Sequence, residues 1–123
     1  ALTVAENLQI WARLHGLDQA AVGPALTRLG LTELSDMPAQ MLSAGLRRRL
    51  ALARLALAPA RLWLLDEPTT SLDDESTGRF IELASSHRQR GGIVVLSSHG
   101  DPGFDAIQLD IADFRAPAAE AAA

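Results

Sequence analysis

Residues 62–73, LWLLDEPTTSLD, decide the fold class of this chain. The first four are apolar, and such a run is too short and too uniformly apolar for a surface helix. It predicts a strand buried on both faces, as in a parallel sheet that is covered by helices. The run ends in two adjacent carboxylates, Asp66 and Glu67, which are followed by a proline and a turn. The two acids therefore stand at the carboxyl end of a predicted strand.

Helices are predicted on both sides of this stretch. Upstream, residues 43–58 carry leucine and alanine at helical spacing, and Pro59 prevents continuation. Downstream, Asp73 or Asp74 caps a helix that continues to about residue 89. The two elements place the acid-bearing stretch between two helices.

Further apolar runs complete the predicted sheet. Residues 93–96 form a second buried strand, and residues 107–111 form a third, weaker one. Buried strands joined by a helix predict a right-handed crossover in a doubly wound, mostly parallel α/β sheet. Ligands of such sheets bind beyond the carboxyl ends of the strands. Asp66 and Glu67 lie at one of these ends, and His99 lies at the next.

The first part of the chain is predicted to be helical. Thr3 and Glu6 resemble a capping box at the start of a helix over residues 3–15. A second helix is predicted over residues 19–29, and a short turn follows at about residues 31–34. His15 and His87 have no supporting neighbours in the sequence and are assigned no role.

Composition limits the classes of function. The 123 residues carry a net charge of −4, contain neither cysteine nor lysine, and include no apolar run long enough to span a bilayer. The negative charge argues against a nucleic-acid partner. We expect a cytosolic location and no secretory signal peptide. The chain begins on Ala1 rather than on methionine, with residues typical of a helix interior. We therefore expect it to be a piece of a longer protein.

The residues at the strand ends suit phosphate chemistry. Asp66 can hold Mg²⁺, usually through water, and Glu67 can sit over an attacking water. His99 can donate to a phosphate oxygen on which charge develops. Alternatives remain open, because an isolated acid pair is usually a solvated strand end and an isolated histidine is usually a loop residue. Helix capping explains the acids at 73–75 better than a metal cluster does.

Three motifs that occur together weaken those alternatives. LSAGLRRRLALARLAL at 42–57, LWLLDEPTTSLD, and VVLSSHG at 94–100 resemble the signature motif, the Walker B motif with D-loop, and the switch histidine of ATP-binding cassette (ABC) ATPases. The resemblance implies a P-loop NTPase fold that binds ATP and Mg²⁺. Residues 1–42 then resemble the helical subdomain, and residues 43–114 resemble the signature helix with the C-terminal part of the core. Residues 115–123 are of low complexity, and we expect them to form a flexible tail.

The resemblance also implies a role for each site residue. The signature residues, which contact ATP bound by a second ATPase subunit in a dimer sandwich, are Ser43, Ala44 and Gly45. Asp66 corresponds to the acid on the Mg²⁺ side and Glu67 to the catalytic base. Asp73 corresponds to the D-loop acid, and His99 to the sensor of the γ-phosphate.

The chain departs from the family pattern in two respects. Leu46 stands where the family usually has glutamine, and no glycine-rich loop with a following lysine is present. We therefore expect the C-terminal portion of an ABC ATPase, inactive by itself. We also expect an exposed strand edge that leads to dimerisation, to element swapping or to disorder near residues 100–123.

Within the family, the sequences of these motifs are most similar to those of the ATP-binding subunit of the bacterial haem exporter of cytochrome c maturation. This resemblance implies a peripheral subunit on the cytoplasmic face of the inner membrane, with integral membrane subunits as partners. Three alternatives remain: another small bacterial ABC exporter ATPase, a soluble ABC ATPase that acts on ribosomes or DNA, and a non-catalytic remnant that only mediates interactions. The chain does not specify the transported molecule.

Overall fold

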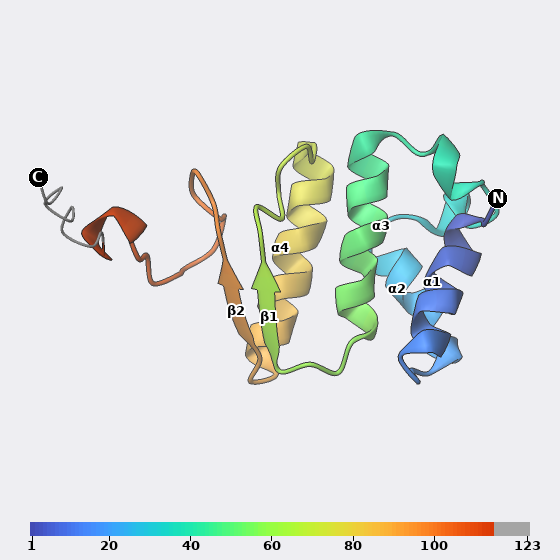
Figure 1. Ribbon diagram of the computed structural model, residues 1–123, viewed down its shortest axis with the longest axis horizontal. Coiled ribbons are helices and arrows are strands. Elements are labelled where there is room, and N and C mark those ends of the chain that lie inside the picture. Colours follow the sequence, from blue (N-terminus) through green and yellow to red (C-terminus); the bar gives the residue numbers. More distant parts are fainter. Residues whose placement is uncertain (115–123) are drawn as a thin grey trace, which may run out of the picture.

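The computed structural model describes residues 1–114, whose arrangement is shown in Figure 1. The longer elements are α1 (Val4–Leu14), α2 (Val22–Arg28), α3 (Ala44–Leu57), β1 (Leu62–Leu65), α4 (Asp74–Gln89) and β2 (Ile93–Leu96). Short 3₁₀ helices are η1 (Gln19–Ala21), η2 (Thr32–Leu34), η3 (Ala39–Met41) and η4 (Ile111–Phe114). The tail that the sequence predicts at 115–123 lies outside the described residues.

The strands β1 and β2 form a parallel pair, and α4 is the crossover between them. Leu62 pairs with Ile93 and Leu65 pairs with Leu96, so the two strands end level with each other. Figure 1 shows α4 behind the strands, α3 beside α4, and the α1–α2 pair on the far side of α3. The predicted strand–helix–strand unit is confirmed, and its level ends bring the segments after β1 and β2 together.

The helix starts agree with the capping residues in the sequence. Thr3 N–H donates to Glu6 Oε2 at 2.8 Å, and Glu6 N–H donates to Thr3 Oγ1 at 3.1 Å, which confirms the capping box. The Asp18 side chain accepts from Ala20 N–H at 2.9 Å. The second predicted helix therefore begins as the 3₁₀ turn η1 and becomes α-helical at Val22.

A hydrophobic cluster joins the helices to the inner face of the sheet. Its largest fully buried side chains are Phe80, Leu8, Leu29, Leu31, Leu83 and Val4. Trp63 is the buried contribution of β1. Burial of an aliphatic or phenyl side chain of this size stabilises a fold by roughly 1.5–3 kcal/mol, so the cluster dominates the packing energy. The helices within residues 1–114 are too short or too polar to cross a membrane.

The prediction that both strands are buried on both faces is wrong for the described residues. Leu64 in β1 and Val95 in β2 are 71% and 54% exposed, and Leu62 and Ile93 are each 48% exposed. Helices pack on one face of the sheet only (Figure 1). Trp63 of β1, by contrast, is buried. The continuous apolar run therefore reflects a second face that nothing within residues 1–114 covers.

The prediction of a third strand over residues 107–111 is also wrong. The segment has no strand structure and ends in η4, and Ile107 and Leu109 are 95% and 76% exposed. Apolar alternation is a local pattern, whereas a strand also needs a neighbour that accepts its ladder of hydrogen bonds. Within residues 1–114 no third strand pairs with β1 or β2, so the pattern alone does not form one.

Candidate functional site

The acid pair lies where β1 ends, and a serine that follows β2 connects to both acids. Ser97 Oγ donates to Asp66 Oδ1 at 2.6 Å and accepts from Glu67 N–H at 2.9 Å. Ser97 N–H also donates to the Leu65 carbonyl oxygen at 3.0 Å, which extends the ladder past the strands. Ser97 therefore fixes the position of the acids relative to β2, a role that the sequence does not reveal.

The Glu67 carboxylate lies between an imidazole and a hydroxyl group. His99 Nε2 is 2.5 Å from Glu67 Oε1, and Thr70 Oγ1 donates to Glu67 Oε2 at 3.2 Å. The His99 side chain is 93% exposed and the Glu67 side chain 37%, so both can meet a ligand from solvent. The prediction that the acid pair and the imidazole share one end of the sheet is confirmed.

The donor set around Asp66 fits a magnesium ion that keeps most of its waters. Mg²⁺ is usually held by one or two carboxylates together with water and substrate phosphates. Among residues 1–114 no group of three or more His, Asp or Glu side chains forms a cage that could hold a metal by itself. Asp66 would therefore supply one ligand, directly or through water, and the phosphates of a substrate would supply others.

Arg48 of α3 also belongs to the site, a role that the sequence motifs do not predict. Its guanidinium donates to the carbonyl oxygens of Asp66 at 2.8 Å, Glu67 at 2.6 Å and Pro68 at 3.4 Å. A hollow of about 290 Å³ is lined by Arg48, Asp66, Glu67, Thr70 and Ser71. The run of three arginines after Leu46 was the available signal, but a run does not tell which guanidinium faces the acids.

The serine-led start of α3 contacts the same turn. Ser43 caps the helix, and its Oγ accepts from Leu46 N–H at 3.2 Å. Ala44 and Gly45 form the first turn, where backbone N–H groups have no acceptor within the helix. A Cβ atom on Gly45 would lie 3.0 Å from the Ser71 carbonyl oxygen. The glycine therefore allows the helix start to pack directly on the turn that carries the acids.

Asp73 lies at the end of this turn as the N-cap of α4. Its Oδ1 accepts from Ser76 N–H at 2.8 Å and is 3.6 Å from Arg49 Nη2. Hydrogen bonds from the Ser76 side chain and backbone, with a smaller contribution from the charge of Arg49, hold the pKa of Asp73 below its ordinary value. The capping interpretation of the acids at 73–75 is confirmed for Asp73.

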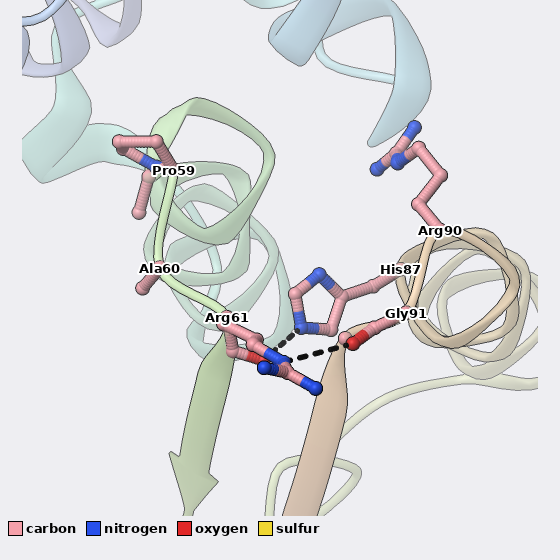
Figure 2. A pocket seen from close by; sticks show the side chains of 8 residues that line it. Pro59, Ala60, Arg61, His87, Arg90 and Gly91 are labelled. Carbon is pink, nitrogen blue, oxygen red and sulfur yellow. Dashed lines mark hydrogen bonds between the residues drawn. The ribbon is translucent and has the colours of Figure 1, made fainter.

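A larger hollow, of about 510 Å³, lies at the opposite end of the sheet, away from the acids. His87 forms part of its wall, and its Nε2–H donates to the Arg61 carbonyl oxygen at 3.0 Å (Figure 2). Arg61 in turn donates to the Gly91 carbonyl oxygen at 3.3 Å. In Figure 2 the Arg61 and Arg90 side chains extend in different directions, so these groups do not converge on one point.

Solved structures with a similar arrangement define the class of protein. One is an ATP-binding subunit of an ABC transporter, with a TM-score of 0.69 over 80% of this chain and 43% of its own length; at 23% identity it shows the fold alone. Another is an ABC transporter ATP-binding protein from Pyrococcus furiosus, 26% identical, with a TM-score of 0.69 over 81% of this chain and 50% of its own. The fold is that of part of an ABC ATP-binding domain.

Sequence comparison gives the family directly. The family model for ABC transporters matches residues 1–70, and the chain belongs to this family. The cytochrome c biogenesis ATP-binding export protein CcmA of Paramagnetospirillum magneticum is 51% identical over 116 residues, which cover 89% of this chain and 54% of that protein. The protein of the same name from Cereibacter sphaeroides is 47% identical, over 94% and 54% of the two chains. The chain thus spans about half the length of the curated relatives it matches.

Proposed function

We propose that this chain forms the acid-bearing part of the ATP-hydrolysing site in the ATP-binding subunit of a bacterial ABC transporter. The observation that carries the proposal is the convergence of Asp66, Glu67 and His99 at one end of the sheet, with 2.5 Å between His99 Nε2 and Glu67 Oε1. In this proposal residues 1–42 are the helical subdomain, and residues 43–114 are the signature helix with part of the core.

Each residue has a distinct part in the proposed reaction. Asp66 would hold Mg²⁺, directly or through water, and the ion would supply counter-charge for the phosphates. Glu67 accepts the proton of the attacking water. His99 donates a hydrogen bond to the γ-phosphate as charge develops on it. Phosphoryl transfer depends mainly on positioning and on counter-charge, and the hydrogen bonds from Ser97 and Thr70 position the two carboxylates.

The absence of lysine from the sequence limits what the chain does alone. A carboxylate about 4 Å from a phosphate charge is repelled by about 4 kcal/mol at an effective dielectric constant of 20. Mg²⁺ and a lysine-bearing phosphate loop would reverse the sign of that interaction. We propose that a polypeptide segment outside these 123 residues supplies the loop, so that the chain by itself does not hydrolyse ATP.

The start of α3 is assigned to a second ATPase subunit in this proposal. Ser43, Ala44 and Gly45 offer backbone N–H groups at a helix N-terminus, which favour an anion. They would contact ATP bound by the partner, with Asp73 beside the subunit interface. Integral membrane subunits would complete the transporter, with this subunit peripheral on the cytoplasmic face of the bacterial inner membrane.

The names of the relatives suggest the transporter. Both are ATP-binding export proteins of cytochrome c biogenesis. We extend that role to this chain as a subunit of the haem exporter of cytochrome c maturation, with another small bacterial exporter as the alternative. Leu46 in the signature and the missing lysine permit a second candidate, a non-catalytic remnant that only mediates interactions, whereas the presence of Glu67 and His99 counts against it.

The test joins this chain to the remaining part of the P. magneticum relative and measures Mg·ATP turnover. We expect turnover in the completed protein and a loss of at least about 100-fold in Glu67→Gln, which keeps the side-chain size and removes the base. Asp74→Asn, which removes an exposed acid in the first turn of α4 outside the hollow, is the matched control.

A folded completed protein that has no turnover, or equal turnover with and without Glu67→Gln, would support the remnant instead. Copurification of membrane subunits with the completed protein separates a transporter subunit from a soluble ATPase. Retention of haem by that complex separates the haem exporter from other small exporters.

A further inference from the structure

We propose that Arg48 is a positioning residue, which sets the backbone turn from which the Glu67 carboxylate projects. The inference rests on the role proposed above for Glu67. It concerns a residue of the signature helix that has no contact with the carboxylate itself and acts on the backbone beneath it.

Three successive carbonyl groups converge on the Arg48 guanidinium. Nη2 donates to the carbonyl oxygens of both Asp66 and Glu67, and Nε donates to that of Pro68. In an extended strand, neighbouring carbonyl groups point to opposite sides, so one nitrogen cannot serve two of them. The contacts therefore require the chain to curl immediately after β1.

The backbone of Glu67 shows this curl. Its φ of 42° lies in the left-handed region, which non-glycine residues adopt rarely and only where the surroundings impose it. Carbonyl dipoles that point the same way repel one another, and a cation with several donors in a planar fork offsets the repulsion. Arg48 is the cationic group that lies on these three oxygens, so it supplies the constraint that the conformation needs.

The other contacts of Glu67 act at different points. Ser97 Oγ accepts from its N–H, and Thr70 and His99 contact its carboxylate oxygens. Arg48 holds the carbonyl side of the peptide, where Thr70 N–H also donates to the Glu67 carbonyl oxygen at 3.2 Å. Among these groups only Arg48 also binds the carbonyl oxygens of Asp66 and Pro68, from a position on α3 that packs against α2 and α4. Without the guanidinium the turn can relax toward an extended conformation, and the carboxylate then leaves the position from which it would accept a proton.

The experiment compares Arg48→Met, which keeps the apolar stem, with Arg48→Lys, which keeps a cation and part of the donor set. Arg47→Met is the matched control, because Arg47 is the adjacent residue and donates instead to the Leu42 carbonyl oxygen at 2.7 Å. All variants are made in the completed protein described above. We expect Arg48→Met to lower kcat by about tenfold or more while the KM for ATP stays within about twofold. We expect Arg48→Lys to recover part of the loss and Arg47→Met to have no effect.

A second readout does not depend on activity. The one-bond Cα–Hα coupling of Glu67, measured by NMR without nucleotide, reports whether φ is positive. We expect Arg48→Met to lose the left-handed value and Arg47→Met to keep it. An unchanged coupling in Arg48→Met overturns the proposal, and so does a changed coupling with unchanged kcat. If Glu67→Gln leaves turnover intact, the function proposed for Glu67 fails, whereas the coupling still decides whether Arg48 holds the turn.

Discussion

At the level of single residues, Gly92 makes room for a buried aromatic stack. His87 is buried and lies parallel to the Trp63 indole, with 3.8 Å between ring centroids and 7° between the ring planes. A Cβ atom on Gly92 would overlap the His87 ring. The sequence indicates only that the glycine pair at 91–92 ends a helix, because the approach of the ring is a tertiary contact.

We predict that Gly92→Ala lowers the free energy of unfolding by roughly 1–3 kcal/mol, because the added methyl group displaces a packed ring. Urea denaturation followed by tryptophan fluorescence measures the change and also reports the movement of His87 away from Trp63. Gly78→Ala in α4 is the control, since a Cβ atom there meets no atom within 4 Å. It should instead stabilise the helix by about 0.5–1 kcal/mol. Equal effects of the two substitutions would contradict the assigned role of Gly92.

Tertiary contacts also limit what the sequence predicts about the residues of the candidate site. Asp66, Glu67 and His99 could be placed at the strand ends because each lies shortly after Leu65 or Leu96, the last residues of the two strands, and strands are local patterns. The roles of Ser97 and Arg48 could not, because they depend on the register of β1 with β2 and on the left-handed curl at Glu67. No sequence pattern encodes which hydroxyl or guanidinium faces that curl.

At the level of secondary-structure elements, the start of α4 is tied to α3 by a buried charge. Arg49 is 7% exposed, and its Nε donates to Ser76 Oγ at 3.0 Å. The same guanidinium lies near Asp73, and its Nη1 donates to the Gly30 carbonyl oxygen at 3.4 Å. Arg49 therefore connects the cap of α4 to the turn that follows α2. The pattern of apolar residues in α3 predicts the helix but not this buried cation.

We predict that the charge of Asp73 makes stability depend on pH. The pKa of Asp73 is lowered from its ordinary value of 3.8, so the folded state favours the carboxylate. The Asp73 carboxylate therefore stabilises the folded state fully above pH 3.8, and this stabilisation is lost as the pH falls through the lowered pKa. Asp73→Asn keeps a capping oxygen without the charge. Between about pH 5 and pH 2, chemical denaturation should show a larger loss of stability in the wild type than in this variant. Parallel declines would contradict the assignment.

At the level of the whole molecule, the sheet has an uncovered apolar face. Leu62, Leu64, Ile93 and Val95 lie on it, and within residues 1–114 no strand pairs with the outer edge of β2. Exposed apolar patches and exposed strand edges promote association. Both faces of each strand are therefore apolar, as in fully buried strands, although helices cover only one face of the sheet.

We predict that the 123-residue chain self-associates through this face at micromolar concentration. The double variant Leu64→Thr, Val95→Thr removes apolar surface from this face, and threonine is a residue that strands favour. Light scattering should therefore show a shift toward the monomer in this variant. Leu14→Gln, at an exposed position on α1 that is 79% accessible, is the control and should not change the mass. A wild-type chain that is monomeric under these conditions would contradict the prediction.

The sequence by itself determined the helices, the two strands, the cap residues and the place of the acids at a strand end. These features depend on apolar periodicity and on contacts between residues close in the chain. Tertiary structure alone decided that the run at 107–111 is not a strand, that one face of the sheet is uncovered, and that Ser97, Thr70 and Arg48 hold the acid pair. The physical reason is that strand pairing, face coverage and side-chain direction depend on neighbours distant in sequence, whose positions only the folded chain specifies.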